Sequence, residues 1–136
     1  MSWRLDDPSY ERAAEAALPK LRAALEGKLR VPPQAESAEA ALALALFYDD
    51  KAKPGTLQEL EGILSMAEYV TDEIPSWAQV AEGFLRLRAR GWLAQEGDRW
   101  GLTRPGREAI GAIVTASKVA AALDEVERWL GLNPAP

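Results

Sequence analysis

This 136-residue chain carries a formal net charge of −5 and contains neither cysteine nor histidine. Disulfides, thiol nucleophiles, Cys/His zinc sites and imidazole acid–base chemistry are therefore excluded, and we expect no cofactor, no metal and no enzymatic activity. The 48% hydrophobic and 27% charged residues are those of an ordinary globular protein, and the acidic balance disfavours nonspecific wrapping of nucleic acid, which relies on summed positive charge.

Residues 1–34 are predicted to form an N-terminal helical arm. Two acids stand near the start, where a secretory signal would carry positive charge and an apolar run, so we expect a cytoplasmic protein. Asp7 followed by Pro8 is typical of an N-cap with proline at the first helical position. Pro19 is expected to kink or split this helix, and the proline pair in VPPQ (31–34) is expected to end the arm.

Residues 35–115 are predicted to form the main domain. Their first helix is the run SAEAALALALFYD (37–49), because alanine and leucine favour helices and the length favours a buried helix over a strand. The run is shorter than the roughly 18 residues that cross a bilayer, so no membrane partner is expected. Thr56 and Glu59 are expected to form a capping box that opens the next helix.

A third helix is expected between a second capping box, Ser76 with Gln79, and a terminating Gly91. Gln79, Glu82 and Arg86 are spaced three and four residues apart, so their side chains point the same way. This face lies opposite the apolar face of the helix.

The segments WLAQ and RWGL, separated by EGD, predict a small β-hairpin over residues 92–102. Trp92 and Trp100 supply the aromatic side chains that pack such a hairpin against helices. Thr103 is expected to cap the helix that follows.

Residues 116–136 are predicted to be a dimerisation element at the end of one long helix, from Arg107 to Leu132. Apolar residues recur there at alternating spacings of four and three over about three heptads, a pattern that indicates a partner helix. We expect a homodimer, and the residues predicted to contact the second copy are Val119, Leu123, Val126 and Leu130.

Positive charge is concentrated in one segment, residues 83–107. Six arginines against two acids give this segment a balance of +4, whereas ten positive and nineteen negative residues give the rest of the chain −9. Such asymmetry indicates an anionic partner. Alternatively, the arginines complement the carbonyl end of a helix and are otherwise solvated. The six are Arg86, Arg88, Arg90, Arg99, Arg104 and Arg107.

Residues 84–110, FLRLRARGWLAQEGDRWGLTRPGREAI, resemble the end of a winged helix-turn-helix domain. In that superfamily the third helix closes with L-x-x-x-G, two apolar residues start the wing, and aromatic-x-Leu-Thr opens the next helix. The resemblance covers about residues 37–115 and implies a mainly α fold with a small β-hairpin, a winged helix-turn-helix core with extra N- and C-terminal helices. The matching residues are Leu87, Gly91, Trp92, Leu93, Trp100, Leu102 and Thr103.

In DNA-reading winged-helix proteins the third helix enters the major groove and the wing touches the backbone or the minor groove. The resemblance therefore implies a homodimeric transcriptional regulator that binds double-stranded DNA. Arginine pairs with guanine and glutamine with adenine, so the chemistry for base reading is present. The implied DNA contacts are Trp77, Gln79, Glu82 and Arg86 on the third helix, Arg99 on the wing and Arg104 near the phosphates.

Winged helices also serve as protein-interaction or assembly modules that bind no DNA, because a fold does not decide a function. The acidic wing tip, Glu96–Asp98, departs from the DNA-binding pattern. The two hypotheses differ on one structural point. Duplex binding requires the arginines of the third helix and the hairpin to converge on one outward face, whereas neighbouring carboxylates that neutralise them one by one would remove its physical basis.

Overall fold

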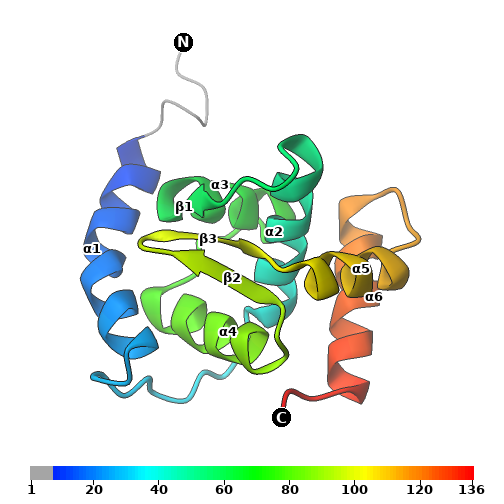
Figure 1. Ribbon diagram of the computed structural model, residues 1–136. Helices are drawn as coiled ribbons and strands as arrows, with labels where there is room; N and C mark the ends of the chain where they lie inside the picture. The colour runs from blue at the N-terminus through cyan, green and yellow to red at the C-terminus, as the bar shows by residue number, and fades with distance from the viewer. Residues whose placement is uncertain (1–7) are drawn as a thin grey trace.

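Six helices and a small three-stranded antiparallel sheet make up residues 8–136, the part of the chain that the computed structural model describes (Figure 1). The helices are α1 (Pro8–Leu25), α2 (Glu39–Ala52), α3 (Leu60–Thr71), α4 (Trp77–Ala89), α5 (Arg104–Ile113) and α6 (Val119–Leu132). The strands are β1 (Gln58–Glu59), β2 (Leu93–Glu96) and β3 (Arg99–Leu102). The prediction of a mainly helical chain is confirmed. Across residues 8–136, no helix combines the length and the apolar character that crossing a membrane requires.

The sheet is built on the predicted hairpin. β2 and β3 pair antiparallel, with Leu93 opposite Leu102, and the turn between them passes through Gly97 at φ +57°. β1 pairs with the other edge of β3, which gives the strand order β1-β3-β2. This third strand was not predicted.

The expected capping box of Thr56 and Glu59 is wrong. Glu59 belongs to β1, opposite Arg99, and α3 begins one residue later at Leu60 without a side-chain cap. The Glu59 carboxylate accepts a hydrogen bond from Arg99 at 2.9 Å instead of folding back on the helix. Strand pairing with β3 therefore decides the conformation at this point.

The other local signals are confirmed. The Ser76 hydroxyl accepts a hydrogen bond from the Gln79 N–H at 3.2 Å, and the Gln79 side chain accepts one from the Ser76 N–H at 2.9 Å. Gly91, at φ +79°, follows the end of α4. Thr103 caps α5 by accepting from the Gly106 N–H at 3.2 Å.

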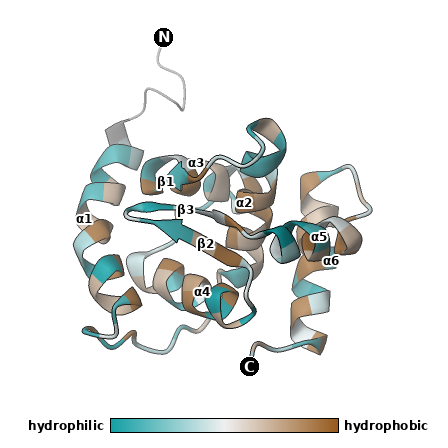
Figure 2. Cartoon of the chain, viewed as in Figure 1, coloured by the Kyte–Doolittle hydropathy of each residue, from teal (hydrophilic) through white to brown (hydrophobic). Residues whose placement is uncertain are grey.

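Helix α2 is the centre of the core. Its residues 39–46 are all buried, and it contacts α3, α4, α5, α6 and β3. Figure 2 shows apolar residues along most of α2 and polar residues at the hairpin tip. A helix enclosed by so many elements needs apolar side chains all round, which explains its alanine and leucine run. Beside it, the rings of Phe84 and Trp100 pack with their centroids 5.5 Å apart.

Helix α1 packs across α3 and α4 (Figure 1). Leu21 is completely buried there, and Ala24 and Leu25 are nearly so. Pro19 does not split the helix, which runs unbroken to Leu25, because the buried residues after the proline hold it against the neighbouring helices. The cap predicted at Asp7 lies outside the described residues.

The predicted single helix from Arg107 to Leu132 is wrong, because residues 114–118 separate α5 from α6. The Glu125 carboxylate accepts hydrogen bonds from the backbone N–H of Thr115, at 3.1 Å, and of Ala116, at 2.8 Å. These bonds fold the link back against α6.

Helix α6 packs on its own chain, against α2, α3 and α5. Val126 is completely buried and Leu130 is 7% exposed, so most of the surface of these two predicted dimer contacts is already covered by their own chain. Val119 and Leu123 are partly buried against the same core. The apolar stripe therefore finds much of its partner surface within the monomer.

Candidate interaction surface

The arginines of α4 are engaged within the chain. Arg86 donates to the Ser37 hydroxyl at 3.0 Å and lies 3.6 Å from the Glu82 carboxylate. Arg88 donates to the Leu25 carbonyl at the end of α1, at 2.9 Å. Both guanidinium groups thus help to join α4 to the segments that flank it.

Arg90, the C-cap residue of α4, forms the most buried ion pair of the described chain. Its Nε lies 2.6 Å from the Glu39 carboxylate, and each of the two side chains is 6% exposed. A second nitrogen donates to the Asn133 carbonyl at 2.6 Å. The guanidinium also lies over the rings of Trp92 and Trp129, at 5.2 Å and 5.8 Å from their centroids. This arginine is a structural tie between α2, α4 and the residues after α6.

Arg99 on β3 and the two arginines of α5 each face a carboxylate, and each carboxylate lies on a different element. Arg107 also donates to the Leu102 carbonyl, at 3.2 Å. The pairs are Arg99 with Glu59 (2.9 Å), Arg104 with Glu108 (3.0 Å) and Arg107 with Asp50 (3.6 Å).

The tip of the β2–β3 hairpin is tied to α1. Asp98 accepts two hydrogen bonds from the Arg22 guanidinium, one of them at 2.8 Å. The hydrogen bond from Arg22 holds the pKa of the Asp98 carboxyl below its ordinary value. Each of the six arginines of the basic segment therefore has a partner within the chain, and these partners lie on α1, the segment before α2, α2, β1, α4, β3, α5 and the C-terminal segment.

The remaining residues implied for DNA contact are also partly occupied. Trp77 is partly buried, and the ammonium of Lys20 on α1 lies 5.5 Å from the centroid of its ring. Gln79 is held in its capping box and reaches the Glu36 carbonyl at 3.5 Å. Glu82 is only 18% exposed at its side chain, beside Arg86.

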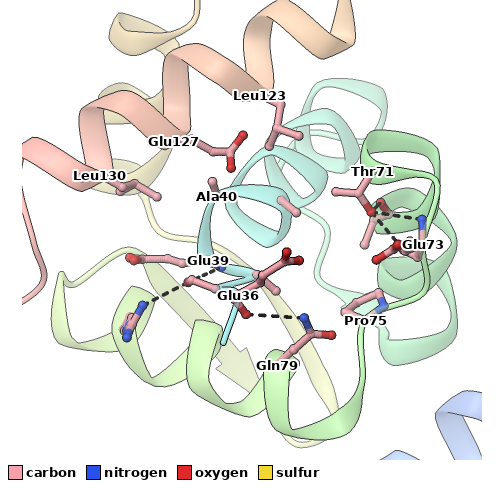
Figure 3. Close-up of a pocket in the computed structure, with 16 residues that line it drawn as sticks. Glu36, Glu39, Ala40, Thr71, Glu73, Pro75, Gln79, Leu123, Glu127 and Leu130 are labelled. Carbon is pink, nitrogen blue, oxygen red and sulfur yellow. Dashed lines mark hydrogen bonds between the residues drawn. The ribbon is translucent and has the colours of Figure 1, made fainter. Parts of the chain in front are cut away.

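A groove of about 580 Å³ runs beside the outer face of α4 (Figure 3). Its walls come from the segment before α2, the end of α3, α4 and α6. The floor is formed by small or apolar residues of α2, α3 and α6, namely Ala40, Ala41, Ala67, Leu123 and Leu130.

Three exposed carboxylates stand at the rim of this groove. Figure 3 shows Glu127 reaching from α6, Glu73 from the segment after α3, and Glu36 from the segment before α2. Within residues 8–136 none of the three side chains forms an ion pair or a side-chain hydrogen bond, and no group of three or more acidic side chains is arranged to hold a metal ion. We call these three residues the acidic rim.

No local pattern in the sequence predicts this groove, because its residues come from four segments between 36 and 131. The one relevant feature was the excess of acids outside residues 83–107. Gln79 and Arg86, expected on the outer face of the third helix, do line the groove, whereas Arg99 and Arg104 do not.

Comparisons with protein-family models, with curated proteins and with solved structures find no match to this chain. The function is therefore inferred from the fold and the groove.

Proposed function

We propose that the chain is a winged-helix module that binds another polypeptide. Support for the fold comes from the element order α2-β1-α3-α4-β2-β3, with the sheet order β1-β3-β2, which agrees with the resemblance in the sequence. In this assignment α4 is the third helix and β2–β3 is the wing. Helices α1, α5 and α6 are additions to that core.

The observation that carries the proposal is the internal engagement of the six arginines. Duplex binding gains its strength when free cations replace the counterions of the phosphates. An exposed pair such as Arg104 with Glu108 is weak and can open, since such pairs are worth about 0 to 1 kcal/mol. The released carboxylate would, however, remain beside the phosphates and repel them. Arg90 is buried and has no route to a phosphate.

Helix α1 gives a second reason. It packs along α4, and Arg22 holds the wing tip through Asp98. A duplex would therefore meet α1 where it needs to approach α4 and the wing together.

A duplex-binding transcriptional regulator, acting as a homodimer, is the second candidate. The specific observation in its favour is that Gln79 and Arg86 lie on the solvent side of a helix that corresponds to the DNA-reading helix of the superfamily. Dimerisation itself stays a prediction.

Two measurements distinguish the candidates. In the first, the chain is presented with a pool of random-sequence duplexes at about 0.1 M salt, through repeated rounds of selection. We expect no enriched sequence. An enriched duplex whose binding is lost in the Arg86→Ala, Arg99→Ala double variant would overturn the proposal in favour of the regulator.

In the second measurement, a photo-crosslinking amino acid replaces Glu36 or Glu127 at the groove, or Glu15 on α1 as the control. Figure 1 shows α1 and α6 on opposite sides of the molecule. We expect crosslinks to another polypeptide from the two groove positions in the native cells and none from position 15. Crosslinks of equal yield from all three positions would contradict a defined interaction surface.

A further inference from the structure

We infer that the groove beside α4 takes a cationic, amphipathic segment of the partner protein. This inference rests on the proposed function, because it assumes that the partner is a polypeptide. It adds the chemistry of the segment that binds and the place where it lies.

The charge of the groove argues for a cationic occupant. Of the side chains that line it in the described chain, Arg86 alone is cationic, and Ser37 and Glu82 hold it. Glu39, also in the lining, is neutralised by Arg90. The acidic rim is left without compensation, and a concave surface lined by one sign of charge concentrates its field on an approaching ligand.

The spacing of the rim argues for an extended occupant. The acidic rim is not a cluster that could hold a metal ion, and its members come from three separate segments. One small cation cannot satisfy all three carboxylates together. A chain segment with several lysines or arginines can, because its charges are spread along its length.

The floor argues that the segment also carries aliphatic side chains. Ala40 and Ala41 line the bottom of the groove and are only 7% and 8% exposed, so they add a small apolar surface there and no polar side chain. Leu123 is partly exposed beside them. Aliphatic residues against this floor and cations at the rim describe an amphipathic segment, the pattern by which helices are bound in grooves.

A second copy of this chain does not fit the groove. Its net charge is −5, and the six arginines of its basic segment are engaged. Two copies with this net charge repel one another, so charge complementarity favours a cationic partner over a second copy.

The experiment is a selection from random peptides of about 15 residues, roughly four helical turns, displayed on phage and captured by the full chain at about 0.1 M salt. We expect the enriched peptides to carry several lysines or arginines together with leucine, isoleucine or valine. Enrichment of acidic or uncharged peptides, or no enrichment, would overturn the inference.

Two matched variants locate the site. The groove variant carries Gln in place of the acidic rim residues, Glu36, Glu73 and Glu127. The control variant makes the same change in net charge at a separate acidic hollow of about 430 Å³ between α1 and the β2–β3 hairpin, with Gln in place of Glu11, Glu15 and Glu96. Urea unfolding of both variants checks that each remains folded.

We expect an enriched peptide to lose on the order of tenfold in affinity for the groove variant, and less than about twofold for the control, because each lost pair is worth a few tenths of a kcal/mol to about 1 kcal/mol. Equal losses in both variants would show attraction to the overall charge and would overturn the site. Crosslinks from Glu36 and Glu127 to a partner, without cationic enrichment, would remove this inference and leave the proposed function. A selected duplex would remove the proposed function itself.

Discussion

Replacing Arg90 with methionine should destabilise the fold strongly, because the change leaves the Glu39 carboxylate buried without its partner. The two side chains are each 6% exposed, and the contact between them is 2.6 Å. The same change removes the hydrogen bond to the Asn133 carbonyl. Methionine keeps much of the apolar contact with Trp92 and Trp129, so the loss of charge dominates the effect.

The expected magnitude follows from the burial. Removing one partner of a buried ion pair costs about 3 to 5 kcal/mol in the free energy of unfolding, because the remaining charge cannot reach water. For a chain of 136 residues this corresponds to a fall in Tm of about 10 to 15 °C. Replacing both partners by apolar residues is far less costly, because no charge is then left in the core.

The assay is urea unfolding followed by tryptophan fluorescence, for the wild type, Arg90→Met, and the double variant Arg90→Met, Glu39→Leu. We expect the double variant to recover about 2 kcal/mol or more of the loss in the single variant. A loss below about 1 kcal/mol in the single variant would refute the reasoning. So would a double variant that is no more stable than the single one.

Two further predictions concern stability. Burial raises the pKa of the Asp49 carboxyl to about 6 from an ordinary 3.8, so the folded chain binds this proton more tightly than the unfolded chain does, and the contribution of Asp49 to stability falls as pH rises from about 4 to 6. Urea unfolding across this range should show that Asp49→Asn lacks this pH-dependent contribution. At pH 7 the variant should be more stable than the wild type by about 1 kcal/mol, a value that allows for partial solvent screening of Asp49. A variant with the same pH profile as the wild type would contradict the role of Asp49. Gly106→Ala should lower the free energy of unfolding by about 2 kcal/mol in the same assay, because the new Cβ would lie 2.9 Å from the Trp92 carbonyl oxygen. Gly111→Ala in the same helix should raise it by up to about 1 kcal/mol. Equal effects of the two variants would contradict the close packing at Gly106.

Short sequence motifs predicted the ends of those helices and strands that are decided by residues nearby in the sequence. Ser76 and Gln79 mark the start of α4, and Gly97 marks the hairpin turn, because a cap or a turn is decided within a few residues. β1 could not be found this way, since it is two residues long and forms only because Gln58 meets Trp100 on β3.

The break between α5 and α6 escaped the heptad pattern for a similar reason. The apolar spacing continues across residues 114–118, and the link is held by Glu125, ten residues beyond Thr115. The spacing of apolar residues does not reveal a hydrogen bond between a side chain and the backbone ten residues before it.

The candidate site was least predictable, because it depends on long-range pairs. Arg90 and Glu39 are 51 residues apart in the sequence, and Arg99 and Glu59 are 40 apart. The composition of residues 83–107 indicated an anionic partner, but several of these arginines pair with carboxylates of the same chain. Among residues 8–136, the three carboxylates of the acidic rim have no ion-pair partner, and only the fold brings them to one groove.

The most direct test of this account is an NMR titration of the isotopically labelled full chain, first with a cationic peptide from the selection and then with a mixed-sequence duplex, at about 0.15 M salt. We expect the peptide to shift the backbone signals of Glu36, Glu73 and Glu127, and the duplex to leave the spectrum unchanged. Duplex-induced shifts at Trp77 and Arg99, with no response of the acidic rim to the peptide, would contradict it.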